Sequence, residues 1–172
     1  MTIELSKAQQ EDYSRYTLWF VFACIIYSII GFSWGALMGG IRNFRNFVDY
    51  SVYGHKIVLA HTHINLLGWV EMAIFAALYD IVPRRSGRPI FSVTLVKVHF
   101  WMHNFGLLGL VGFFTLAGLV GAMPISGDPD EPARIYHAMM GLGGMFGSLV
   151  LLANIIWGYN LYRTTIGWKE RQ

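Results

Sequence analysis

Long apolar stretches separated by short charged segments dominate the chain. Residues 16–41, 98–127 and 135–162 contain no Asp, Glu, Lys or Arg, and residues 57–79 contain only Glu71. A helix that crosses a bilayer needs about 20 mostly apolar residues. The pattern therefore predicts an all-α four-transmembrane-helix bundle, a single membrane domain over residues 1–172. We expect its helices at about 16–40, 54–80, 92–121 and 133–163.

Composition excludes several classes of protein. Apolar residues make up 55% of the chain and charged residues 13%, whereas about a quarter of a soluble domain is charged. This balance argues against a water-soluble fold, intrinsic disorder and nucleic-acid binding. Cys24 is the single cysteine, which excludes both an intrachain disulfide and covalent haem attachment through Cys-x-x-Cys-His.

The basic residues predict an orientation. If the chain crosses the membrane four times, nine of its 13 Lys and Arg residues fall on the side of the termini and four on the other side. Cytoplasmic loops carry the excess of Lys and Arg, so both termini should be cytoplasmic. Residues 82–89 should form the inner turn between the second and third helices. The acidic segment 127–132 should join the third and fourth helices outside.

Six histidines carry the chemistry that the sequence indicates. They are His55, His61, His63, His99, His103 and His137. Most of them fall within apolar spans, where an ionisable residue indicates a functional site. Imidazole suits iron, copper and other transition metals. Metal binding, with non-covalent haem b fitting best, is therefore one interpretation; histidines that only hydrogen-bond between helices are the other.

The spacing of the histidines separates two groups. His61 and His63 are two residues apart on a helix that turns about 100° per residue, so they point to opposite flanks and would serve different sites. His99 and His103 are four residues apart and share one face. They would suit a compact metal site, or one ligand with a helper beside it.

The segment from His61 to Trp69, which reads HTHINLLGW, resembles the His-x-His helix of the catalytic subunit of haem–copper oxidases. Within this family it looks like the cbb-type oxidases and nitric oxide reductases, and His99-Phe100-Trp101 resembles the following helix of the cbb-type subunit. In the family's His-x-His helix one histidine binds a low-spin haem and the other a high-spin haem. The resemblance thus implies His61 and His63 as haem ligands, with His103 the next candidate and His99 after it.

This chain departs from the family pattern in size and in its copper ligands. The family subunit has about twelve helices in three groups of four, of which one group is present here. An adjacent His-His pair and a His-Pro-Glu segment are both absent from the sequence. Three copies in a closed ring would imitate the twelve helices, with His61 of one subunit facing His63 of the next across each interface. Ligation within one subunit is the alternative.

A second metal is a further hypothesis. His99 and His103 could chelate one ion, and Glu71 could add an oxygen ligand. Histidine ligands alone would favour copper, whereas a set that includes the carboxylate would favour iron or zinc. Glu71 could instead relay protons, or simply form a structural hydrogen bond.

The sequence therefore predicts a b-type haem protein of the bacterial cytoplasmic (inner) membrane that carries electrons through bis-histidine haem. A quinol or a cytochrome would donate the electrons. An oxygen or nitric oxide reductase is one alternative, and a non-catalytic gas sensor or oxidase assembly module is another. We expect a homo-oligomer, with a trimer favoured, in contact with membrane lipid.

Overall fold

A computed structural model describes residues 5–51, 53–121 and 131–166, and every regular element within those ranges is a helix. The elements are α1 (Lys7–Gly40), α2 (Arg42–Tyr50), α3 (Gly54–His63), the π-helix η1 (Ile64–Val70), α4 (Glu71–Ser86), α5 (Val93–Val120) and α6 (Glu131–Thr165). Since α3, η1 and α4 follow one another without a break, they form one long helix. Within the described ranges, four helices are therefore long and apolar enough to cross a membrane, as predicted.

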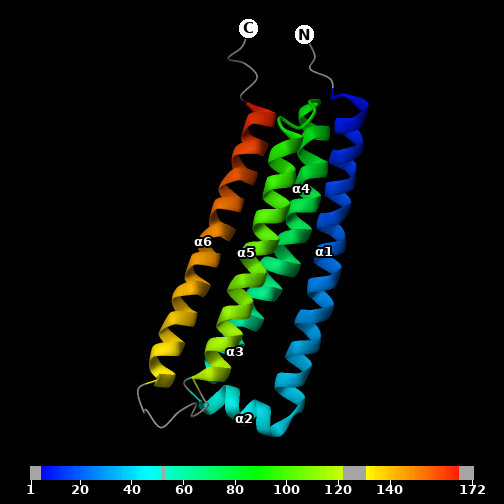
Figure 1. The fold of residues 1–172 in the computed structure, drawn as a ribbon. Helices are drawn as coiled ribbons and strands as arrows, with labels where there is room; N and C mark the ends of the chain where they lie inside the picture. Colours follow the sequence, from blue (N-terminus) through cyan, green and yellow to red (C-terminus); the bar gives the residue numbers. More distant parts are fainter. Residues whose placement is uncertain (1–4, 52, 122–130, 167–172) are drawn as a thin grey trace.

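The long helices run side by side as an elongated bundle (Figure 1). α5 packs against α6 on one side and α3 on the other, while α1 packs against η1 and α4. The start of α1 and the end of α6 lie at the same end of the bundle. Fully buried aromatic side chains, Phe20, Phe75 and Tyr79, fill the core between α1, α4 and α5.

The ends of the helices depend on local chemistry that hydropathy does not report. α1 begins at Lys7 rather than near residue 16, because Ser6 and Gln9 form a capping box at its first turn. α4 continues through Pro83 into the expected inner turn and ends at Ser86, and Gly87, with a φ of 64° that suits glycine, is its C-cap. Pro83 has no N–H to donate to the Tyr79 carbonyl, and the Tyr13 hydroxyl donates to that carbonyl instead.

α2 is a short helix that the span pattern does not predict. It lies across the end of the bundle opposite the end where α1 starts (Figure 1). Val48 is buried, while Arg42 and Arg45 are exposed. Such a helix with one apolar and one basic face is typical of a membrane interface. The predicted acidic connection at 127–130 lies outside the described residues, as do the side chains of Glu131 and Pro132.

Candidate functional site

His61 lies on the flank of α3 that faces α1. Its ring centroid is 6.3 Å from that of Trp34. A Cβ at Gly35 would lie 3.1 Å from the Cε1 atom of His61. The Asn65 amide nitrogen donates to the His61 carbonyl oxygen at 2.9 Å and lies 3.2 Å from Nδ1 of the ring. His61 is therefore held between α1 and Asn65.

His63 faces α5 instead. Its ring centroid is 5.5 Å from that of Phe114, and its Nδ1 donates to the Leu59 carbonyl at 2.7 Å. A carbonyl oxygen only accepts hydrogen bonds, so the proton is on Nδ1 and the lone pair is on Nε2. The two histidines therefore lie on opposite flanks of the helix, in agreement with their spacing, and they do not meet within one chain.

His99 and His103 lie deep between α4, α5 and α6, and both are 0% exposed. Their ring centroids are 5.9 Å apart and their planes almost perpendicular. His99 Nδ1 is 3.0 Å from the Tyr79 hydroxyl, and His103 Nε2 donates to the Leu67 carbonyl at 3.0 Å. Leu67 belongs to η1, and π-helical turns often occur at functional sites. No pattern of side chains in the sequence indicates this contact with the backbone.

The remaining nitrogens of this pair have no hydrogen-bond partner among the described residues, and neither does the Glu71 Oε2 atom. His99 Nε2, His103 Nδ1 and Glu71 Oε2 are all buried. Glu71 Oε2 lies 3.7 Å from His103 Nε2, and the Asn154 side chain lies near the Glu71 carboxylate. Because buried polar atoms are normally satisfied, these atoms mark a polar cluster in the bundle. Sequence reasoning missed Asn154, although an amide within an apolar span could have indicated it.

The predicted metal ligands do not gather into one set. Across residues 5–51, 53–121 and 131–166, no three His, Cys, Asp or Glu side chains come close enough to hold a metal ion together. Glu71 approaches His103, but His61 faces α1 and His63 faces Phe114. The structure thus separates three environments: the His61 flank, the His63 flank, and the cluster of His99, His103 and Glu71.

The last two histidines lie near the end of the bundle where α2 crosses. His55 is exposed, with its Nδ1 atom 3.0 Å from the Ser51 carbonyl oxygen. His137 is also exposed and contacts the neighbouring ring of Tyr136. Neither is enclosed in the way His99 and His103 are.

Gly31 and Gly35 make room on α1 for the side chains beside His61. A Cβ on Gly31 would lie 2.8 Å from the Asn65 Cγ atom, whereas a Cβ on Gly39 would meet nothing within 4 Å. We expect Gly31→Ala to lower the free energy of unfolding by about 1–3 kcal/mol, the usual effect of overpacking. Gly39→Ala, on the same helix, is the matched control. Unfolding of both variants in the same detergent would measure this, and equal stability would contradict the packing argument.

Comparison with known proteins gives a match over nearly the whole chain. The family model described as cytochrome c and quinol oxidase polypeptide I matches residues 7–168. The cytochrome c oxidase subunit 1 homolog of Agrobacterium tumefaciens is 25% identical over 167 residues, which cover 88% of this chain and 29% of that protein. These matches confirm the relationship that the His-x-His segment indicated.

Two further bacterial relatives agree. The Cbb3-type cytochrome c oxidase subunit CcoN1 of Stutzerimonas stutzeri is 27% identical over 116 residues, which cover 62% of this chain and 24% of that protein. The cytochrome c oxidase subunit 1 of Rhodobacter capsulatus is 29% identical over 137 residues, which cover 72% of this chain and 24% of that protein. The chain thus spans between about a quarter and three tenths of the length of these relatives.

Proposed function

Because the chain belongs to the family of cytochrome c and quinol oxidase polypeptide I, we propose that it is a b-type haem protein of the bacterial cytoplasmic membrane that carries electrons. Four membrane-spanning helices and bacterial relatives support the location. Haem supplies a one-electron couple when two histidines hold its iron. A quinol or a cytochrome would donate the electrons.

The observation that carries this proposal is the hydrogen bond from His63 Nδ1 to the Leu59 carbonyl. Histidines that bind a metal usually donate their other ring N–H to a carbonyl or carboxylate, which fixes the tautomer and the ring orientation. His63 has this arrangement, and its Nε2 lone pair is available. The ring is also half-buried beside the apolar Phe114. The residue therefore fits the role of an iron ligand.

His61 fits the same role after one rearrangement. Its Nδ1 faces the Asn65 amide nitrogen, which donates, so the proton of His61 is on Nε2 in this conformation. A half-turn of the Asn65 amide would present its oxygen to Nδ1 and leave Nε2 free to bind iron, at the cost of the hydrogen bond that Asn65 now donates to the His61 carbonyl. Asn65 would then orient His61 as the Leu59 carbonyl orients His63.

The second part of the proposal is a homo-oligomer in which neighbouring subunits share each haem. Since His61 and His63 face opposite flanks of α3, a site that uses both of them needs two chains. A closed ring brings the same two flanks together at every interface. We favour a trimer, in which each interface would combine His61 of one subunit with His63 of the next.

A second candidate function is reduction of oxygen or nitric oxide at a haem with a second metal nearby. The unpartnered nitrogens of His99 and His103 favour it, with Glu71 as an oxygen donor beside His103. In this case His103 and His99 would bind copper or another transition metal rather than act as structural groups. The fit is poorer, because no three-ligand set forms among the described residues.

Spectroscopy and metal analysis of the purified protein test both candidates. A bis-histidine haem b should give a low-spin spectrum with a b-type alpha band on reduction, and it should not bind carbon monoxide. A second metal should appear as non-haem metal that is lost in His99→Ala/His103→Ala. Colourless protein that cannot be reconstituted with haem would refute the proposed function. A haem that binds carbon monoxide, together with such a metal, would favour the second candidate.

A further inference from the structure

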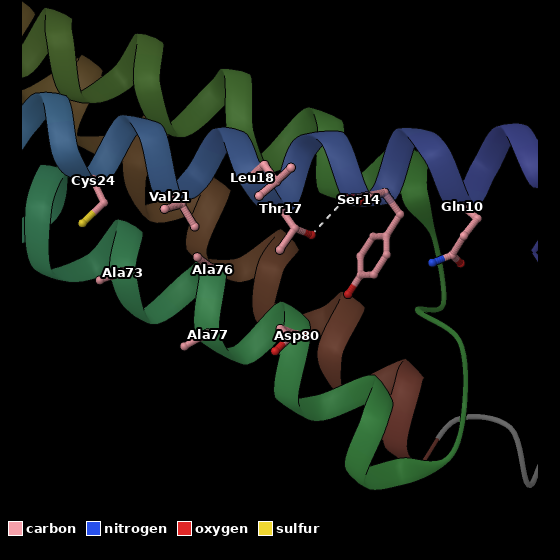
Figure 2. A pocket seen from close by; sticks show the side chains of 11 residues that line it. Gln10, Ser14, Thr17, Leu18, Val21, Cys24, Ala73, Ala76, Ala77 and Asp80 are labelled. Carbon is pink, nitrogen blue, oxygen red and sulfur yellow. Dashed lines mark hydrogen bonds between the residues drawn. The ribbon is translucent and has the colours of Figure 1, made fainter.

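A groove runs between α1 and α4 in the half of the bundle where α1 starts (Figure 2). It has a volume of about 620 Å³. Gln10 and Asp80 lie toward one end, and Cys24 and Ala73 lie at the other. From Gln10 to Cys24 the groove follows α1 for about 21 Å at a rise of 1.5 Å per residue. One leaflet of the hydrocarbon core is about 15 Å deep, so the groove is long enough to reach from the interface into the leaflet.

The walls of the groove change in character along its length. Beyond Thr17 the lining is apolar and includes small side chains, Ala73, Ala76 and Ala77. Ala77 is exposed, so this part opens toward the surroundings of the bundle. Because lipid surrounds a transmembrane helix there, an apolar chain from the bilayer can enter the groove sideways.

A second cavity of about 440 Å³ continues the groove at its polar end. Gln10, Tyr13 and Asp80 line both cavities, so the two are contiguous. The second cavity adds two arginines, Arg84 and Arg88. An apolar groove therefore leads directly into a cavity that is lined in part by two basic side chains.

The two arginines can bind an anion in addition to their present partners. Arg84 donates hydrogen bonds from Nε to the Asp80 backbone carbonyl and from Nη2 to the Asp80 carboxylate. Arg88 donates one from Nη1 to the Thr165 carbonyl at 2.8 Å. A guanidinium carries five N–H groups, so each arginine has further donors. The Arg84 side chain is 69% exposed and can reorient toward a ligand. Arginine is well suited to phosphate because its fork of donors matches the phosphate oxygens.

We propose that an anionic glycerophospholipid, such as phosphatidylglycerol, binds in these two cavities. Its phosphate lies between Arg84 and Arg88, and one acyl chain follows the groove past Ala77 toward Cys24. Basic pockets between transmembrane helices at the cytoplasmic face bind anionic headgroups, which agrees with the predicted orientation of this end. A neutral amphiphile would fill the apolar groove without any need for the arginines. This proposal does not depend on haem binding.

Native mass spectrometry of the full chain, washed free of lipid in mild detergent, tests the proposal. Phosphatidylglycerol and phosphatidylcholine with identical acyl chains are the two probes. We expect the protein to retain phosphatidylglycerol preferentially. Arg84→Gln/Arg88→Gln should reduce that retention by about 30-fold. Each basic residue near an anionic surface contributes roughly 1 kcal/mol of attraction, which is about fivefold in affinity, and the variant loses two of them. Arg85→Gln is the matched control, because Arg85 is exposed and lines neither cavity.

A second variant tests the place of the acyl chain. Ala77→Leu narrows the apolar groove and should reduce retention of phosphatidylglycerol. Ala138→Leu makes the same change at an exposed position on α6 and should have no effect. Equal retention of both lipids, an equal effect of Arg85→Gln, or full retention by Ala77→Leu would each overturn the proposal. Complete displacement of the lipid by inorganic phosphate would also overturn the proposal, because binding would then depend on the phosphate group and not on the acyl chain.

Discussion

Replacement of His63 by alanine is expected to remove the low-spin haem spectrum and to reduce haem content at least about tenfold, since the variant loses an iron ligand and not merely a supporting hydrogen bond. The hydrogen bond to the Leu59 carbonyl holds His63 in the tautomer that leaves Nε2 free. The ring contact at this position is with Phe114, whose side chain cannot bind iron in place of His63.

The control for this experiment is His55→Ala. His55 is on the same helix but is exposed, and its Nδ1 atom lies 3.0 Å from the Ser51 carbonyl oxygen. The optical spectrum, haem content per chain and electron paramagnetic resonance of both variants would be compared with the unmodified protein. An unchanged spectrum in His63→Ala would remove His63 from the site, whereas loss of haem in both variants would indicate a general defect in folding.

The spans could be predicted because the membrane requirement is simple. A long apolar stretch is recognisable in sequence, and each of the four predicted spans corresponds to a long apolar helix among the described residues. The ends were less predictable, because they depend on single contacts. Ser6 extends α1 through its capping box, and the Tyr13 hydroxyl satisfies the Tyr79 carbonyl where Pro83 interrupts α4. Such contacts are hard to predict, because their residues are either far apart in the chain or look like ordinary polar residues in the sequence.

The flanks of the helix on which the histidines lie could be predicted from the sequence, but the groups that contact them could not. An α-helical period correctly separated His61 from His63, because both precede the π-helix and its altered turn. From Ile64 to Val70 the backbone is π-helical, so the α-helical period of about 100° per residue no longer gives the direction of a side chain. His103 meets the Leu67 carbonyl, an atom of the backbone, so no pattern of side chains could indicate it. Asn154 and Tyr79 complete the buried cluster from two other helices, and only the packing of α4, α5 and α6 brings them together.

Co-expression of His61→Ala and His63→Ala chains should restore a haem site that neither variant forms alone. If each haem lies between two subunits, a chain with only His63 can complete a chain with only His61. In a closed trimer that contains both kinds of chain, one interface of the three combines the two intact histidines. We therefore expect about one third of the low-spin haem of the unmodified trimer.

Two affinity tags, one on each variant, would isolate the mixed oligomers before haem is measured. Differently tagged His63→Ala chains, purified in the same way, provide the matched control and should stay without the low-spin signal. Ligation within one chain gives a different result, because mixing the variants then creates no new pair of ligands. Haem content equal to the weighted mean of the two single variants would therefore contradict the shared site, and it would leave the assignment of His63 to be judged by the single variant alone.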